Sequence, residues 1–204
     1  MSGSLVVVSG PSGSGKSSLC KAVCEAYDFA HLSISTTTRA PRSGEREGED
    51  YFFASKEQFR AAIDSGDFLE WAQVHDNFYG TSKSRVIEAL EAGRTVLFDI
   101  DVQGQAAISA LFPKETTSVF VTTPDIAVLR QRLAGRGTDS EEVIEKRLIN
   151  ALSEMNQLDR YDYLLVNDDY DDSLEVLKAM VLASRYKVSR VSLPEFISTW
   201  KGQS

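Results

Sequence analysis

The chain has 204 residues, a length that suits one α/β domain with a small insertion better than two full domains. Hydrophobic residues make up 42% and charged residues 25% of it, which excludes a disordered or low-complexity chain. The 22 Lys and Arg against 30 Asp and Glu give a net charge of −8, so we expect no general binding of nucleic acid.

The first residues predict neither a signal peptide nor a membrane span, because they hold no basic segment and their apolar run stops at Val8. We therefore expect a cytoplasmic protein without a membrane partner. Cys20 and Cys24 lie four residues apart in one predicted helix. At that spacing they stack on one helix face, which favours structural thiols over a disulfide or a metal site.

Apolar runs typical of buried strands alternate with helical patterns along the chain. The expected strands are 5–8, 32–34, 95–99, 118–121 and 164–166, and the expected helices are 17–27, 82–92, 104–111, 125–133, 140–158 and 173–186. This alternation predicts parallel βαβ units and an α/β fold with a doubly wound parallel sheet of about five strands. Residues 36–81 interrupt it with short strands and one helix near 56–64, which indicates a small α+β insertion. Glycines flank residue 136 between two helices and predict a mobile lid there.

Residues 10–17, GPSGSGKS, match the pattern G-x-x-x-x-G-K-[ST] directly after the first expected strand and before the first helix. Glycines let backbone N–H groups turn toward phosphate oxygens, and the helix directs its positive end at the same anion. The lysine adds a charge, and the final serine offers a hydroxyl to Mg²⁺. We predict a site for a nucleoside triphosphate and Mg²⁺ on Gly10, Pro11, Ser12, Gly13, Ser14, Gly15, Lys16 and Ser17.

Three further features point to partners of this loop. Asp99 ends an expected strand, where a nucleotide-binding protein of this class places a carboxylate for Mg²⁺ or its waters; the alternative is a capping aspartate. Arg39 and Arg42 lie three residues apart in the insertion, a pattern that suits a phosphate monoester, with solvated surface charges as the alternative. Tyr51 and Tyr79 offer hydroxyl donors or serve as core aromatics.

Several linked motifs resemble the guanylate kinase family of P-loop nucleoside monophosphate kinases, in that family's order and spacing over roughly residues 4 to 186. They are residues 10–17, 35–42, Gly44-Glu45, 48–51, Glu70-Trp71-Ala72, Asn77 with 79–81, 99–101 with Gln103-Gly104, Arg132 with 135–137, and 166–168. The resemblance implies a core P-loop kinase domain of residues 1–35 and 82–204, with a lid at about 135–147. Residues 36–81 would form the GMP-binding insertion.

The resemblance also implies roles for individual residues. The phosphate of GMP is expected on Arg39, Arg42, Tyr51 and Tyr79, and the guanine on Ser35, Glu70 and Thr81, with Asp101 supporting that site. The ATP phosphates are expected on the loop with Arg132, Arg136 and Arg147, and the adenine near Asn167. The expected catalytic residues are Lys16, Arg39, Arg136 and Arg147, and the expected Mg²⁺ ligands, direct or through water, are Ser17 and Asp99.

The expected reaction is transfer of the γ-phosphoryl group of ATP to GMP by direct in-line attack, giving ADP and GDP. The attacking phosphate oxygen is already anionic near neutral pH, so positioning and charge stabilisation matter more than a general base. Two alternatives stay open. A related kinase of ribose phosphates would need no base-reading Glu70 and Thr81, and a non-enzymatic protein-binding module of this family is expected to have lost parts of the loop or pocket. The oligomeric state is left open, and residues 188–204 receive no role.

Overall fold

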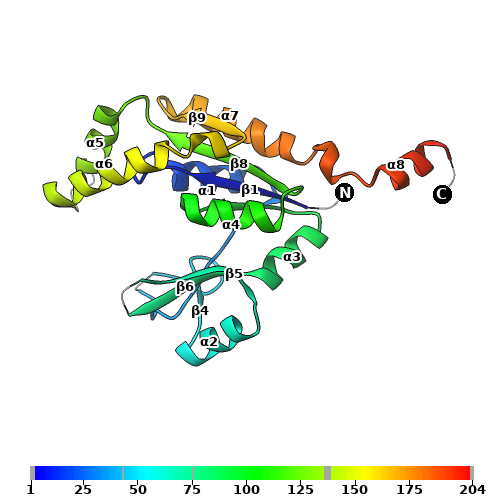
Figure 1. Ribbon diagram of the computed structural model, residues 1–204, viewed down its shortest axis with the longest axis horizontal. Coiled ribbons are helices and arrows are strands. Elements are labelled where there is room, and N and C mark those ends of the chain that lie inside the picture. Colours follow the sequence, from blue (N-terminus) through cyan, green and yellow to red (C-terminus); the bar gives the residue numbers. More distant parts are fainter. Residues whose placement is uncertain (1–2, 43, 75, 136–138, 203–204) are drawn as a thin grey trace.

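The computed structural model describes residues 3–42, 44–74, 76–135 and 139–202 (Figure 1). Its larger sheet has five parallel strands in the order β2-β7-β1-β8-β9. The strands are β1 (Ser4–Ser9), β2 (Ala30–Leu32), β7 (Thr95–Asp99), β8 (Thr116–Thr122) and β9 (Tyr163–Val166). The prediction of an α/β fold with a five-stranded parallel sheet is confirmed.

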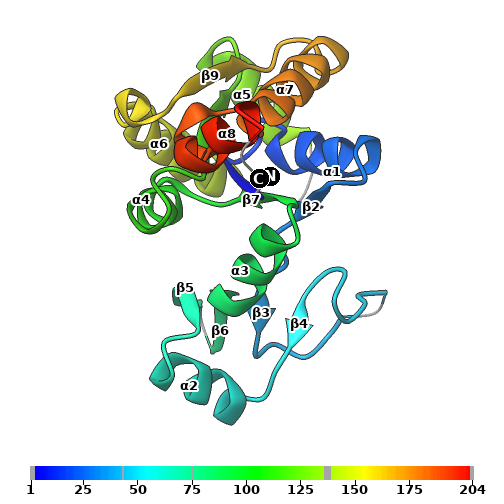
Figure 2. The same cartoon turned by 90° about the vertical axis from the view of Figure 1, so that its right-hand side faces the viewer.

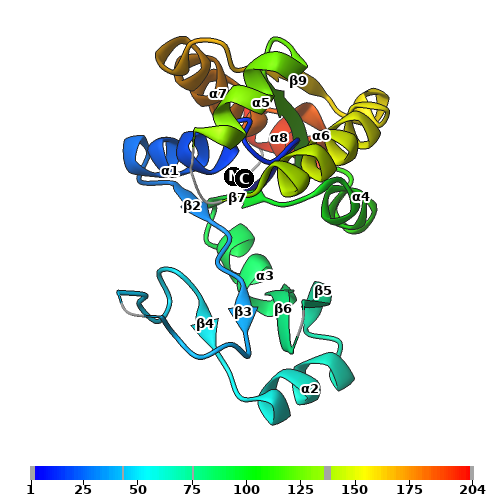
Figure 3. The ribbon, with the colours of Figure 1, turned by 90° about the vertical axis from the view of Figure 1, so that its left-hand side faces the viewer.

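Helices cover both faces of this sheet, because the side chains of its central strand alternate between two apolar layers. Val6 and Val8 of β1 pack in one core cluster with Leu19 and Leu177, and the intervening Leu5 and Val7 pack in a second cluster on the other face. Figures 2 and 3 accordingly show α1 and α7 on one side of the sheet and α4 on the other. The helices that follow the strands of this sheet and the insertion are α1 (Lys16–Ala26), α3 (Lys83–Glu91), α4 (Val102–Leu111), α5 (Ile126–Ala134), α6 (Glu141–Met155) and α7 (Tyr170–Ser184).

A second, four-stranded sheet lies to one side of the parallel sheet, in the order β4-β3-β6-β5 (Figure 2). Its elements are β3 (Thr36–Thr37), β4 (Phe52–Phe53), α2 (Lys56–Asp64), β5 (Phe68–Val74) and β6 (Asn77–Ser82). Its own small core centres on Phe59 of α2, whose ring stacks on Phe68 at 4.3 Å and on Phe78 at 5.4 Å between ring centres. The expected α+β character of this segment is therefore present.

The second expected strand was placed two residues too late. The backbone pairs Ala30 with Thr95 and Leu32 with Leu97, and residues 33–35 leave the sheet for the insertion. The apolar run alone did not locate this edge strand, because its position depends on the parallel partner β7. The short helix η1 (Leu158–Arg160) lies between α6 and β9, and η2 (Val188–Arg190) and α8 (Leu193–Trp200) follow α7.

Cys20 of α1 is buried in the core, and Cys24 packs against the same core cluster, so both lie on one face of the helix. Burial among apolar residues raises the pKa of the Cys20 thiol well above its ordinary value, which keeps it uncharged. No helix within the described ranges is long and apolar enough to cross a membrane. The expected cytoplasmic location stays a prediction.

Candidate active site

The loop between β1 and α1 forms a cradle that only glycine permits at two points. Gly10 has φ +132°, and a Cβ built there would lie 2.0 Å from the Val121 carbonyl oxygen of β8. Gly15 has φ +97°, and a Cβ there would lie 2.3 Å from Asn167 Nδ2. Any side chain would push the loop away from the neighbouring strand or from the residue that follows β9. The backbone N–H groups of the loop and of the first turn of α1 thus surround one hollow.

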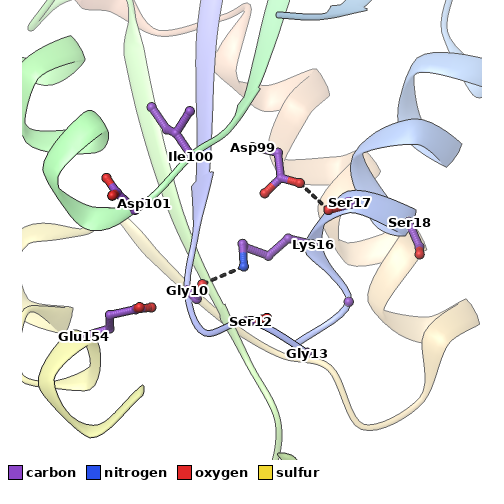
Figure 4. Close-up of a pocket in the computed structure, with 11 residues that line it drawn as sticks. Gly10, Ser12, Gly13, Lys16, Ser17, Ser18, Asp99, Ile100, Asp101 and Glu154 are labelled. Carbon is purple, nitrogen blue, oxygen red and sulfur yellow. Dashed lines mark hydrogen bonds between the residues drawn. The ribbon is translucent and has the colours of Figure 1, made fainter. Parts of the chain in front are cut away.

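Lys16 and Ser17 present their side chains to this hollow from the first turn of α1 (Figure 4). Lys16 Nζ donates to the carbonyl oxygens of Gly10, at 2.5 Å, and Pro11, at 3.0 Å. The Ser17 hydroxyl donates to the Asp99 carboxylate. Asp99 reaches this position because β7 runs parallel to β1 and pairs Asp99 with Val8, just before the loop. A hydroxyl and a carboxylate are the hard oxygen donors that Mg²⁺ prefers, so these residues fit the predicted metal role.

The predicted ATP-side arginines approach the loop from α5 and α6. Arg147 donates from Nη1 to Ser12 Oγ at 2.8 Å and from Nη2 to Asp139 Oδ1 at 3.2 Å. Arg132 lies behind the loop, where its Nη2 donates to the backbone oxygens of Asn167, at 2.9 Å, and Asp168, at 3.3 Å. The predicted lid at 135–147 includes residues 136–138, so Arg136 lies outside the described residues.

Asn167 braces the loop directly. Its Nδ2 donates to the Ser14 carbonyl oxygen at 2.7 Å, and the side chain is buried. This hydrogen bond joins residues 153 positions apart and holds the loop against the end of β9. A role near adenine stays a prediction, and the observed contact makes Asn167 a support of the loop between β1 and α1.

Glu154 is a pocket residue that the sequence reasoning missed. A cavity of about 360 Å³ runs from the loop past Asp99 and Asp101 to Glu154 of α6 (Figure 4). Burial raises the pKa of the Glu154 carboxyl, nearby Lys16 opposes that rise, and Asp101 adds to it. The available signal was spacing: Glu154 follows Arg147 by two helical turns, so both side chains lie on one face of α6.

The Arg39 side chain and the Arg42 backbone both donate hydrogen bonds to the carboxylate of Glu45. Arg39 Nη2 donates to Glu45 Oε1 at 2.7 Å and Oε2 at 2.9 Å, and the Arg42 backbone N–H donates to Glu45 Oε2 at 2.8 Å. These bonds raise the pKa of Arg39 and lower the pKa of Glu45. The Arg39 guanidinium lies 5.4 Å from the centre of the Tyr51 ring, and that ring lies 6.1 Å from Tyr79. The structure therefore gathers Glu45, Tyr51 and Tyr79 around Arg39. The Arg42 side chain is exposed.

The predicted base-reading residues are only partly gathered. Thr81 Oγ1 donates to Glu70 Oε1 at 2.6 Å, because β5 and β6 pair these two residues directly. Ser35 precedes β3 and accepts the Phe52 N–H at its backbone oxygen, at 2.9 Å. Asp101 lies apart from them at the start of α4, where its carboxylate accepts the N–H groups of residues 103 and 104 and lines the cavity of the phosphate loop.

Comparison with known proteins decides the family. The family model described as guanylate kinase matches residues 2–184 of this chain. This chain belongs to the guanylate kinase family. It is 46% identical to the guanylate kinase of Wolinella succinogenes over 98% of this chain and 94% of that one. It is 45% identical to the guanylate kinase of Helicobacter pylori strain HPAG1 over 98% of this chain and 97% of that one.

A solved structure agrees with this membership of the guanylate kinase family. The crystal structure of guanylate kinase from Anaplasma phagocytophilum superposes with a TM-score of 0.74 at 29% identity, covering 97% of this chain and 94% of that one. The resemblance read from the sequence is confirmed, and the chain is a nucleoside monophosphate kinase that catalyses ATP:GMP phosphoryl transfer. The findings favour neither the ribose-phosphate kinase nor the protein-binding module.

Proposed function

We propose that the loop cradle is the ATP site and that the Glu45 and Glu70 clusters together form the GMP site of this kinase. The observation that carries the proposal is the arrangement of β6, where Tyr79 and Thr81 are two residues apart and therefore share one face. Thr81 belongs to the Glu70 pair, and Tyr79 belongs to the aromatic group beside Arg39. One face of one strand thus connects a base-reading pair with a phosphate-binding cluster, as a nucleoside monophosphate requires.

On the GMP side, Glu45 occupies the donors that a phosphate would use. Two carboxylate oxygens accept from Arg39 and from the Arg42 N–H, in the fork geometry that a phosphate oxygen pair also fits. We propose that Glu45 orients the Arg39 guanidinium, and that Arg39, Arg42, Tyr51 and Tyr79 hold the phosphate of GMP. Glu70, Thr81 and Ser35 would then read the guanine, with Asp101 acting from the neighbouring helix terminus.

On the ATP side, we assign the phosphates to the loop, Lys16, Arg132, Arg136 and Arg147. Lys16 and Arg147 now bond to oxygens of the loop itself, Gly10 and Pro11 for the former and Ser12 for the latter. Phosphate oxygens would compete for these donors because a charged acceptor forms stronger hydrogen bonds than a neutral one. Mg²⁺ would be held by Ser17 and Asp99, directly or through water, and its charge would offset that of the phosphates.

Catalysis by these residues requires positioning and charge compensation. The acceptor oxygen of GMP carries its charge before the reaction, so no side chain has to remove a proton from it. Lys16, Arg39, Arg136 and Arg147 would stabilise the charge that develops on the transferred phosphoryl group. Closure of the site would exclude water, which otherwise competes with GMP for that group.

The two sites lie on different sheets, which supports a division into two moving units. The cradle belongs to β1 of the parallel sheet, and the Arg39 cluster belongs to the sheet formed by β3, β4, β5 and β6. We propose that residues 1–35 and 82–204 form the core domain and that residues 36–81 form the GMP-binding domain, which moves toward the core when both substrates are bound.

The test is release of ADP from ATP and Mg²⁺ in the presence of GMP, AMP, CMP or UMP, measured with a coupled assay. We expect turnover with GMP and a kcat/KM lower by several orders of magnitude with the other three, since sites that hydrogen-bond a substrate reject analogues by up to about 10⁴-fold to 10⁵-fold. Equal turnover of all four would remove the assignment of Glu70 and Thr81 as base-reading residues. Omission of Mg²⁺ should abolish turnover, and activity in excess chelator would remove the metal role of Ser17 and Asp99.

A further inference from the structure

Asn167 reaches the phosphate loop from the side that faces away from the cavity. Its Nδ2 donates to the Ser14 carbonyl oxygen at 2.7 Å, and neither of these two residues is among the described residues that line the cavity. Gly15, the next residue of the loop, does line it, beside the labelled Lys16 and Ser17 of Figure 4. The peptide bond between Ser14 and Gly15 therefore lies between Asn167 and the cavity.

The hydrogen bond to Asn167 sets the orientation of this peptide bond. The bond is trans, so its C=O and N–H point in opposite directions. With the Ser14 C=O directed at Asn167, the Gly15 N–H is directed to the cavity side. Within the part of the chain that the structure describes, no acceptor receives this N–H, which leaves it available to a ligand in the cavity.

The loop needs an external restraint at this point because of its glycines. Gly13 and Gly15 lie on either side of Ser14 and have φ +93° and +97°. Glycine adopts positive and negative φ with similar ease, so the backbone around Ser14 has little preference of its own for one orientation of the peptide bond. The hydrogen bond from Asn167 supplies that preference.

Asn167 is itself held in a fixed position. Its backbone N–H donates to the Thr122 carbonyl oxygen of β8 at 2.7 Å, and its carbonyl oxygen accepts from Arg132 Nη2 of α5 at 2.9 Å. The side chain is 2% exposed, and its Oδ1 is buried without a partner among the described residues. The contact with Ser14 is therefore what the buried carboxamide contributes, since an apolar side chain would avoid the unpaired oxygen.

We propose that Asn167 is a positioning residue for phosphoryl transfer. It holds the Ser14–Gly15 peptide bond with its N–H in the cavity, where this N–H donates to a phosphate oxygen of ATP as a preorganised donor. The inference rests on the ATP site proposed above. It differs from the contact with adenine that the family resemblance implies, because Asn167 acts here through the loop and its effect is independent of the base.

The test compares binding of Mg²⁺-ATP with binding of Mg²⁺-tripolyphosphate, which has no base, by isothermal titration calorimetry. Asn167→Leu removes the donor without adding a charge. Asn167→Asp also removes it, but keeps an acceptor oxygen for the adenine amino group. We expect each variant to weaken both probes by a similar factor of at least about 10-fold, because one charge-assisted hydrogen bond is lost, and to leave KM for GMP unchanged.

A second measurement follows the Gly15 N–H itself. In protein labelled with ¹⁵N-glycine, the amide signal of Gly15 should shift when Mg²⁺-tripolyphosphate binds to the wild type. The same addition should leave this signal in place in Asn167→Leu. Asn150→Leu is the matched control, since Asn150 is exposed on α6 and should leave binding and the signal as in the wild type. Tm of every variant reports whether the fold is intact.

Three results would overturn the proposal. Weaker binding of ATP with unchanged binding of tripolyphosphate would assign Asn167 to the adenine. Unchanged binding of both probes would remove any role in the site, and a lower Tm with an equal loss of affinity for GMP would show structural support only. Lys16→Ala tests the ATP site separately: if it binds both probes as the wild type does, the proposed ATP site itself is wrong.

Discussion

The Thr81 hydroxyl lies 2.6 Å from Glu70 Oε1, across the directly paired strands β5 and β6. A donated hydrogen bond orients the carboxylate and leaves its second oxygen with its acceptor capacity. Guanine presents two adjacent donors, N1–H and the 2-amino group, and adenine presents an acceptor at N1. In the proposed role, the Glu70 carboxylate would accept from both guanine donors, and it would meet the N1 acceptor of adenine with like polarity.

Glu70→Gln replaces one acceptor oxygen with an NH₂ donor. We expect this variant to lose most of its GMP activity and to narrow the ratio of kcat/KM for GMP over AMP by at least about 10-fold. Both substrates are measured on both proteins at one Mg²⁺ concentration. Glu88→Gln, on the exposed side of α3, is the control and should keep the wild-type ratio. If Glu70→Gln keeps the wild-type ratio of kcat/KM for GMP over AMP, Glu70 does not read the base. Guanine selection would then be assigned to Ser35, Thr81 or backbone groups.

Arg42 has its backbone N–H bound to Glu45 and its side chain exposed, so its loss should spare the fold. We expect Arg42→Ala to raise KM for GMP about 10-fold to 100-fold, since a lost charge-assisted contact costs about 1.5–3 kcal/mol, with a much smaller effect on KM for ATP. Arg46→Ala, four residues along the same loop, serves as the control. A larger increase in KM for ATP than in KM for GMP would contradict this assignment and place Arg42 at the ATP site.

Lys16 donates to two loop carbonyls, which fixes its amino group over the cradle. We expect Lys16→Ala to lower kcat by roughly 10²-fold or more, because the developing phosphoryl charge loses one preorganised donor. Lys21→Ala, an exposed lysine on the same helix, should behave as the wild type. Circular dichroism and Tm establish that both variants fold, and a folded Lys16→Ala with normal kcat would refute the assignment.

Asp67 joins the loop before β5 to the start of α3. Its carboxylate accepts from the Ser84 N–H and the Ser82 hydroxyl, both at 2.9 Å. Burial alone would raise the pKa of Asp67, but these hydrogen bonds outweigh it and the pKa lies below the ordinary value. The folded pKa is lower than the unfolded value of about 3.9, so the carboxylate stabilises the fold above that pH and loses this effect as the pH falls through the folded pKa.

Asp67→Asn should therefore lower Tm by roughly 2–4 °C at pH 7, as expected for a loss of about 1 kcal/mol at a helix start in a chain of this size. The difference from the wild type should shrink as the pH falls through the folded pKa of Asp67, below which both proteins lack the charge. Thermal unfolding is followed from neutral to acid pH, with the exposed Asp64→Asn as the control. A difference that is constant over this range would show that geometry, not charge, accounts for the effect.

The sequence by itself determined the phosphate loop and the alternation of strands and helices, because both depend on residues close together in the chain. Residues 10–17 form one continuous segment that contains the whole motif. Unbroken apolar runs predict the buried strands. The acceptor residues were recognised through their motifs. Their roles at the substrates, and the division into two domains, stay predictions.

Only the tertiary structure decided which distant residues meet. Ser17 contacts Asp99 across 82 positions, Ser12 contacts Arg147 across 135, and Ser14 contacts Asn167 across 153. These contacts exist because the sheet orders its strands β2-β7-β1-β8-β9, which places the ends of β7 and β9 near the loop after β1. No local pattern encodes that order, since it arises from the packing of two apolar layers on a shared sheet.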